Sequence, residues 1–284
     1  MDGIELIIWL QTFSGPVLDR FFILATDLGH EHFYMLLLPV IYWCLDKRLG
    51  ARLGALFLGS MFLNFFLKDL LMLPRPDGNQ VRVLYPESGG GYGFPSGHAQ
   101  GNTTVWGYLM SRYPGRAFWA LGLTIIFLVS LSRLYLGVHY PSDVVGGVAL
   151  AVALIVAFNR ILEPQVARLS WKHKMALAAV LPLAAAAVYR QPDGYMLAGL
   201  LWGLGTGYLA ESRLVRWEPE ALYWQQAVKL ALGLLVFFGL RVATSPLFPP
   251  GLPQILRFAL IGGWVSLAAP YLFTRLGLAL KSRD

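Results

Sequence analysis

The chain has 284 residues, of which 56% are hydrophobic and 14% are charged. Soluble domains carry about 25% charged residues, and here apolar runs close to the ~20 residues that cross a bilayer recur along the chain. The composition therefore excludes a soluble protein and predicts an integral membrane protein. The single cysteine, Cys44, excludes an intramolecular disulfide and a cysteine metal cluster.

The first predicted element is an N-terminal segment, residues 1–30. Residues 4–28 are amphipathic and are interrupted at Gly15-Pro16, which predicts a segment that lies in the membrane interface or dips partly into the bilayer. The opening "MDGIELIIWL" is acidic where a signal peptide would be basic, so we do not expect cleavage of a signal.

Hydropathy predicts about nine membrane spans in the rest of the chain, which makes the fold an all-α, polytopic membrane helix bundle. A polar stretch at 161–174 separates residues 31–162, expected to be the functional core, from additional C-terminal helices at 163–284. The spans are expected at 32–46, 51–73, 95–112, 117–135, 140–160, 175–190, 194–211, 226–245 and 254–275.

The positive charge of the chain, formally +7, follows the membrane topology. With the N-terminus outside, 15 of the 23 Lys and Arg residues fall in inside loops and the C-terminal tail, and 8 fall outside. Cytoplasmic loops are enriched in these residues, so we expect the C-terminus inside. The same bias accounts for the net charge without a nucleic-acid partner.

Three polar stretches interrupt the apolar pattern, and the predicted topology puts all three at the outer face. They are "KDLLMLPRP" from Lys68, "GFPSGHAQGN" from Gly93, and "SRLYLGVHYPSD" from Ser132. Charged residues at membrane depth are costly and are usually functional. The three stretches together supply the candidate site residues Lys68, Arg75, Ser96, Gly97, His98, Arg133, His139 and Asp143.

The spacing of these residues resembles the three-part signature of the type 2 phosphatidic acid phosphatase superfamily. Six residues separate Lys68 from Arg75-Pro76, Pro95-Ser96-Gly97-His98 is contiguous, and Ser132-Arg133 is followed after five residues by His139 and after three more by Asp143. The resemblance covers about residues 60–147 and implies a six-helix phosphatase core. Among the members, sphingosine-1-phosphate phosphatases look most similar.

The residues themselves indicate a phosphate site. A helix N-terminus binds anions through unpaired N–H groups and its dipole, so Ser96 and Gly97 are expected to cradle phosphate after Pro95 begins the helix. Lys68, Arg75 and Arg133 are expected to stabilise the charge of a transferring phosphoryl group. Because no carboxylate cluster suits a hard cation, we expect neither a metal nor another cofactor.

Two histidines and one aspartate could perform the chemistry. A neutral imidazole can attack phosphorus, a carboxylate four residues later can fix its tautomer, and a second histidine can protonate the leaving group. The sequence alone leaves the two histidines interchangeable. The family resemblance implies that His139 is the nucleophile, Asp143 its partner and His98 the acid.

Other polar residues are weaker candidates. The Gly-rich segment 77–92 could act as a lid, with Arg82, Tyr85 and Glu87 as its substrate contacts. His30 caps the first span close to the outer face, where it could touch substrate.

The sequence therefore predicts a metal-independent membrane phosphatase that hydrolyses a lipid phosphate monoester, or a polyprenyl pyrophosphate, through a phosphohistidine at the non-cytoplasmic face. A bacterial inner membrane with a periplasmic site is the expected location. Three alternatives stay open: a lipid-linked phosphotransferase, a phosphatase of a soluble sugar, and a transporter or flippase that keeps the motif for binding. The identity of the lipid and the oligomeric state also stay open.

Overall fold

The computed structural model describes residues 3–281, and the described chain is helical. Within this range, the only β pairing is an isolated bridge between Trp217 and Lys281. The helices form two compact units, each built from two separate pieces of the chain. Unit 1 comprises residues 1–34 and 63–161, and unit 2 comprises residues 35–62 and 162–284.

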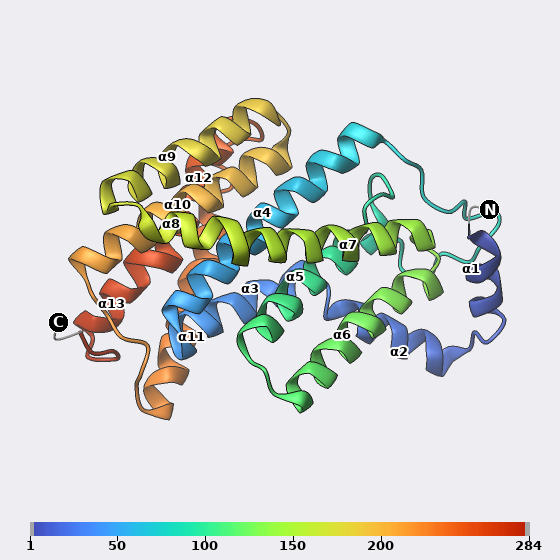
Figure 1. The fold of residues 1–284 in the computed structure, drawn as a ribbon, viewed down its shortest axis with the longest axis horizontal. Helices are drawn as coiled ribbons and strands as arrows, with labels where there is room; N and C mark the ends of the chain where they lie inside the picture. The colour runs from blue at the N-terminus through green and yellow to red at the C-terminus, as the bar shows by residue number, and fades with distance from the viewer. Residues whose placement is uncertain (1–2, 282–284) are drawn as a thin grey trace. The chain divides into compact units, whose positions relative to one another are not determined.

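Unit 1 is built around α5 (Gly97–Arg112), which packs against both α6 (Arg116–Tyr135) and α7 (Pro141–Ala157) (Figure 1). The N-terminal helices α1 (Ile4–Gln11) and α2 (Pro16–Asp27) pack against α6. Pro16 at the first turn of α2 follows the extended Gly15, a sequence typical of a helix start.

The N-terminal segment is thus part of the packed unit. Ile7 and Phe22 are buried, and Phe22 joins Tyr135, Leu136 and Val138 in one apolar cluster. Its position relative to the bilayer stays a prediction.

The chain passes between the units at three points, after Tyr34, Phe62 and Ile161, and the second of these falls inside α4 (Lys47–Leu71). After α4, a long segment containing a short 3₁₀ turn, η2 (Pro86–Gly89), leads to α5. The helix α3 (Glu31–Val40) ends in a π-helical turn, η1 (Ile41–Leu45), and α7 ends in another, η3 (Phe158–Leu162).

Unit 2 contains the C-terminal helices. These are α8 (Glu163–Arg168), α9 (Trp171–Val188), α10 (Pro192–Leu214), α11 (Tyr223–Ala243), α12 (Gln254–Gly263), the π-helical turn η4 (Trp264–Ala268) and α13 (Ala269–Arg275).

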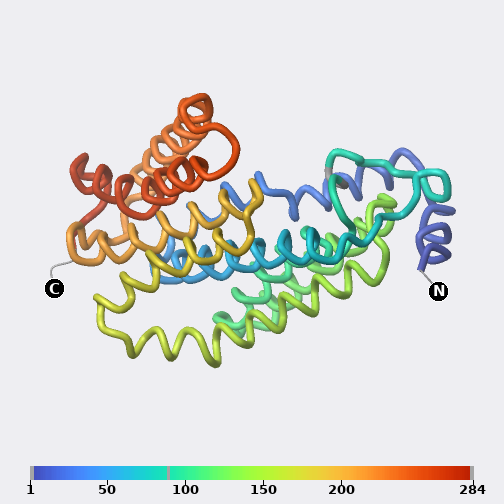
Figure 2. Tube along the Cα trace, turned by 90° about the horizontal axis from the view of Figure 1, so that it is seen from above, coloured from blue at the N-terminus to red at the C-terminus, as the bar shows by residue number. Residues whose placement is uncertain are grey.

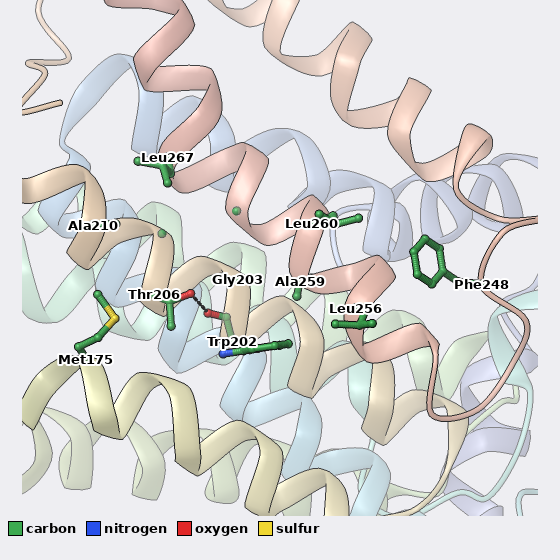
Figure 3. Close-up of a pocket in the computed structure, with 12 residues that line it drawn as sticks. Met175, Trp202, Gly203, Thr206, Ala210, Phe248, Leu256, Ala259, Leu260 and Leu267 are labelled. Atoms are coloured by element: carbon green, nitrogen blue, oxygen red, sulfur yellow. Dashed lines mark hydrogen bonds between the residues drawn. The ribbon is translucent and has the colours of Figure 1, made fainter. Parts of the chain in front are cut away.

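Helix α10 contacts both α9 and α12 (Figure 2). A Cβ at Gly203 would overlap the backbone of Ala259, so glycine permits the close approach of α10 and α12. Beside this contact lies an apolar cavity of ≈ 640 Å³, bordered by Met175, Trp202 and Phe248 among others (Figure 3).

The core of unit 2 combines aromatic rings with a buried cation. Trp43, Trp217 and Phe273 have no exposed surface. The equally buried Lys229 donates from Nζ to the Trp43 carbonyl oxygen at 2.9 Å and to the Pro219 carbonyl oxygen at 2.7 Å. A buried ammonium needs such acceptors because it loses its hydration.

The all-helical fold confirms the predicted class, and a helix lies at each predicted span. Within residues 3–281, five helices are long and apolar enough to cross a membrane, and Glu31–Leu45 is a shorter apolar helix. The count of nine spans therefore stays a prediction. The three consecutive segments 1–30, 31–162 and 163–284 likewise stay a division of the sequence, whereas the two units divide the chain in space.

Candidate active site

The first motif begins at the end of α4. Lys68 lies in the last turn of this helix, is 8% exposed, and donates from Nζ to the carbonyl oxygens of Tyr92 at 2.6 Å and Gly93 at 3.0 Å. Arg75, in the following segment, donates from Nε to the Gly91 carbonyl oxygen at 2.9 Å. The two cations therefore hold residues 90–93, which lead into the second motif.

The second motif forms the N-terminus of α5. Ser96 is the N-cap, and its hydroxyl oxygen accepts a long hydrogen bond of 3.5 Å from the Ala99 amide. The first helical residue is Gly97, where a Cβ would lie 3.3 Å from Asn64 Oδ1. Because the amides of a first helical turn have no acceptor within the helix, this turn can bind an anion. Pro95 precedes the N-cap, which corrects the expectation that it begins the helix.

His98 lies in this first turn. Its Nε2 atom is buried and has no hydrogen-bond partner among the described residues. A buried polar atom without a partner is unfavourable, so this nitrogen is suited to a ligand group that enters the site. Arg133, Arg75 and Lys68 all lie within electrostatic range of the ring.

The third motif spans the end of α6 and the start of α7. Arg133 is fully buried in the last turn of α6, where Nη1 donates to Thr26 Oγ1 at 2.6 Å. Gly137, with φ of 70°, reverses the chain between the helices in a conformation that favours glycine. Pro141 begins α7, as predicted.

His139 is held at both ring nitrogens. Nδ1 lies 3.2 Å from Asp143 Oδ2, and Nε2 lies 2.9 Å from Arg75 Nη1. A guanidinium can only donate, so Nε2 accepts this bond and the proton of a neutral ring is on Nδ1, facing the carboxylate. The tautomer follows from the chemistry of the partners, and it leaves the lone pair of Nε2 on the side of the cations.

The Asp143 carboxylate has two local roles. Oδ2 also accepts from the Tyr140 amide at 3.0 Å, which caps the N-terminus of α7. The Asp143 backbone oxygen accepts from the Ser96 amide at 2.9 Å. These bonds fix the starts of α5 and α7 beside each other, so the N-terminus of α5 and His139 are positioned together.

The charges of the site favour an anion. Burial, followed by the nearby Arg133 and Arg75 cations, lowers the pKa of His139 well below its ordinary value, so the ring is neutral at pH 7. Burial also lowers the pKa of Arg75, and Asp143 opposes this change. Lys68, Arg75 and Arg133 thus surround the neutral His139 imidazole with positive charge.

The contacts described above bring the eight predicted site residues together at the ends of α4 and α6 and the starts of α5 and α7, while their individual roles stay predictions. Of the predicted loop contacts, Arg82 donates to Asp19 Oδ1 on α2 at 2.6 Å, and the Tyr85 hydroxyl is hydrogen-bonded to the Asp27 carboxylate. His30 lies beside His98, with ring centroids 6.0 Å apart.

Two polar residues at the site are absent from the sequence prediction. Asn64 donates from Nδ2 to the Pro95 carbonyl oxygen at 3.2 Å and to Gln100 Oε1 at 2.7 Å. Its position one helical turn before Lys68 was a usable signal, since residues four apart share a helix face. Thr26, the partner of Arg133, belongs to a distant helix and gave no such signal.

Across residues 3–281, no three His, Cys, Asp or Glu side chains are close enough together to hold a metal ion.

Comparison with protein families gives two matches. Residues 49–166 match the model described as PAP2 superfamily, and residues 195–281 match the model described as PAP2 superfamily phosphatase, transmembrane extension.

Individual relatives agree with these matches. Human sphingosine-1-phosphate phosphatase 2 is 37% identical over 138 residues, which are 46% of this chain and 35% of that protein. The chain thus spans about a third of that relative's length. Decaprenylphosphoryl-5-phosphoribose phosphatase from Mycobacterium tuberculosis is 33% identical over 149 residues, which are 50% of this chain and 81% of that protein.

One solved structure extends the likeness to the fold. The transmembrane PAP2-type phosphatidylglycerolphosphate phosphatase from Bacillus subtilis superposes with a TM-score of 0.50 at 25% identity. The superposition covers 57% of this chain and 85% of that structure.

Proposed function

Because the chain belongs to the PAP2 superfamily, we propose that it is a membrane phosphatase that hydrolyses a lipid phosphate monoester through a phosphohistidine on His139. The geometry of His139 carries the proposal. Its Nε2 accepts from Arg75 while Nδ1 faces Asp143, so a neutral nucleophile is oriented toward the cations that would hold a phosphate.

Binding would place the phosphate at the N-terminus of α5. The amides of Gly97 and the residue after it can donate to phosphate oxygens, and the three cations of the motifs can neutralise the remaining charge. Arginine binds two phosphate oxygens in parallel, whereas lysine acts as a point charge. Such an arrangement favours the transition state because charge spreads over the equatorial oxygens.

In the first chemical step, Arg75 Nη1 transfers its hydrogen bond from His139 Nε2 to a phosphate oxygen. The freed lone pair of Nε2 then forms the N–P bond as the ester P–O bond breaks. Asp143 stabilises the positive charge that develops on the imidazole. His98 acts as an imidazolium, a form that the negative charge of the bound phosphate favours. Its buried Nε2 donates the proton to the leaving alkoxide, which leaves the ring neutral.

In the second step, water attacks the phosphorus of the phosphohistidine. His98, which has lost its proton, accepts one from the water, and the N–P bond breaks. Inorganic phosphate leaves and both histidines return to their starting states. Each step uses only groups of this chain, so the proposal needs no metal ion.

An amphiphilic substrate is favoured by the relatives, whose names specify a sphingoid-base phosphate and a decaprenyl-linked phosphate. The chain itself has helices apolar enough to be embedded in a bilayer. The distribution of Lys and Arg favours a site on the non-cytoplasmic side, in a bacterial inner membrane, with the C-terminus inside. A polyprenyl pyrophosphate would satisfy the same site.

The direct test is phosphate release by detergent-purified protein in excess EDTA. The substrates are a panel of lipid phosphates and glucose 6-phosphate, and His139→Ala is assayed in parallel. Release from a lipid that survives EDTA and disappears in the variant is expected. Absence of release by folded protein from every substrate would refute hydrolysis.

A phosphotransferase could use the same phosphohistidine, and a labelled alcohol acceptor added to this assay would reveal the transfer product. Retention of biological activity by His139→Ala would instead favour transport.

A further inference from the structure

The last residues of α2 and its connection to α3, residues Thr26–His30, lie against two residues of the phosphate site. We call this segment the α2–α3 junction. It is outside the three motifs and outside residues 49–166, the range of the matched phosphatase family. Its contacts reach both Arg133 and His98, which belong to different motifs.

The first contact fixes Arg133. Arg133 Nη1 donates to Thr26 Oγ1 at 2.6 Å, and both side chains are fully buried. A hydrogen bond from a charged donor is short and strong, and a buried hydroxyl has few other orientations. The next residue, Asp27, is hydrogen-bonded to Tyr85, which lies within electrostatic range of Arg133. The guanidinium is therefore bordered by the junction itself and by a residue bonded to it.

The second contact fixes His98. A Cβ built on Gly29 would lie 3.1 Å from His98 Cδ2, 3.3 Å from His98 Cβ and 2.8 Å from Val129 Cγ1. Real Cβ atoms do not approach another atom as closely as 2.8 Å, and the two distances to His98 are tighter than most real contacts. A methyl group at this position would therefore displace Val129 and press the His98 ring by a few tenths of an ångström. The His30 ring lies beside the same imidazole at an interplanar angle of 64°. The junction thus forms a wall behind His98.

A third contact ties the junction to α5. Asn102 donates from Nδ2 to the Leu28 carbonyl oxygen at 3.1 Å, one helical turn after His98. The junction is therefore bonded to α6 through Arg133 and to α5 through Asn102. A displacement of the junction would move both motif residues.

We propose that the α2–α3 junction is a fourth positioning element of the phosphate site. Thr26 holds the Arg133 guanidinium at the phosphate oxygens, and Gly29 holds the His98 ring so that Nε2 meets the leaving group. The proposal rests on the proposed function. Neither Thr26 nor Gly29 touches the substrate, and both act through the side chains they position.

Substitutions of Thr26 and Gly29 are expected to change different kinetic constants. Thr26→Val keeps the shape but removes the acceptor, so KM and the Kd for orthovanadate, a phosphate mimic, are expected to rise about 10-fold. Thr26→Ser keeps the hydroxyl and is expected to restore both values. Gly29→Ala displaces the acid and is expected to lower kcat about 10-fold or more while KM changes little.

Matched controls separate positioning from general damage. Thr103 is 3% exposed on α5, and its hydroxyl has no partner among residues 3–281, so Thr103→Val tests the loss of a buried hydroxyl. Gly15 has no atoms within 4 Å of a built Cβ, so Gly15→Ala tests the added methyl group. Calorimetric titration with orthovanadate gives both Kd and the fraction of intact sites. A purely structural role would lower that fraction and leave Kd and KM unchanged.

The outcomes are distinct. Suppose that wild-type protein releases phosphate, and that KM, kcat and the Kd for orthovanadate of Thr26→Val and Gly29→Ala match those of their controls. The junction then has no positioning role, and the proposed function stands. If wild-type protein binds orthovanadate without releasing phosphate, the proposed function fails, and the positioning role is tested by the orthovanadate Kd of Thr26→Val alone. A Kd equal to that of Thr103→Val would refute the positioning role. If wild-type protein does neither, both proposals fall. Should Gly29→Ala not fold, Thr26→Val and its serine rescue decide.

Discussion

Replacing Asp143 with asparagine tests the carboxylate beside His139. Asp143 Oδ2 lies 3.2 Å from His139 Nδ1 and 3.0 Å from the Tyr140 amide nitrogen, and both nitrogens can donate to it. Asparagine retains the shape and one acceptor oxygen, so it can cap α7 and hold the neutral ring. What it lacks is the negative charge that would stabilise the imidazolium formed during attack.

The size of the effect follows from that difference. A hydrogen bond to a charged group contributes about 1.5–3 kcal/mol, and about 1.36 kcal/mol corresponds to tenfold in rate. We therefore expect kcat of Asp143→Asn to fall about 10- to 150-fold. KM should change little, because Asp143 faces His139 Nδ1 and not the side of the ring on which the proposed phosphate would lie.

The assay is steady-state phosphate release, combined with single-turnover measurement of an acid-labile, alkali-stable phosphoenzyme. Asp46→Asn is the matched control, since Asp46 Oδ1 accepts from the Arg48 and Leu49 amides at the start of α4 and touches no histidine. A kcat for Asp143→Asn within threefold of the control would refute the assigned role of the charge.

Three further predictions concern stability and pH. Gly147→Ala would place a Cβ 2.6 Å from the Ser96 carbonyl oxygen, so we expect α5 and α7 to separate and the free energy of unfolding to fall by about 1–3 kcal/mol. Burial lowers the pKa of His139, so below pH ~6.5 the unfolded chain binds a proton that the native chain does not. The free energy of unfolding should therefore decrease as the pH is lowered, and His139→Asn should reduce this dependence. Lys229→Met would leave the Trp43 and Pro219 carbonyls without their donor and should cost about 1–3 kcal/mol for each of these buried groups.

Thermal unfolding in detergent measures all three changes. Gly59→Ala is the control for the glycine variant, since no atom lies within 4 Å of its built Cβ. Lys172→Met, at an exposed position, is the control for Lys229. Unfolding midpoints equal to those of the controls would contradict the packing arguments, and a pH dependence unchanged in His139→Asn would contradict the burial argument.

The parts of the site that depend on local rules could be predicted from the sequence. His139 and Asp143 are four residues apart around Pro141, which begins a helix, so the ring and the carboxylate meet across its first turn. Ser96 and Gly97 form a helix N-terminus for the same reason. The identity of the nucleophile came only from family resemblance, because both histidines have suitable neighbours.

Contacts set by tertiary packing could not be predicted. Thr26 and Arg133 are 107 residues apart, and nothing in "FILATDLGHE" indicates an arginine partner. The close approach of Gly29 to His98 likewise depends on how α2 packs against α6. A glycine in a turn has many ordinary explanations.

The two units differ from the sequence division for a related reason. Composition changes at 161–174, which suggested a break there. The chain also passes from unit 2 to unit 1 inside α4, between Phe62 and Leu63. A helix of 25 residues shows no composition shift at that point. Only its packing partners change, and these are remote in sequence.

The hydrogen bond between Lys229 and the Trp43 carbonyl has a consequence for biosynthesis. The two residues are 186 positions apart, so the Trp43 carbonyl is made long before the lysine that donates to it. Residues 63–161 leave the ribosome between the two pieces of unit 2, and domains generally fold in order of synthesis. Unit 1 can therefore be complete while Trp43 still awaits α11. A chain that ends before residue 222 lacks α11, so its incompletely packed aromatic core would be exposed to membrane-insertion and quality-control factors.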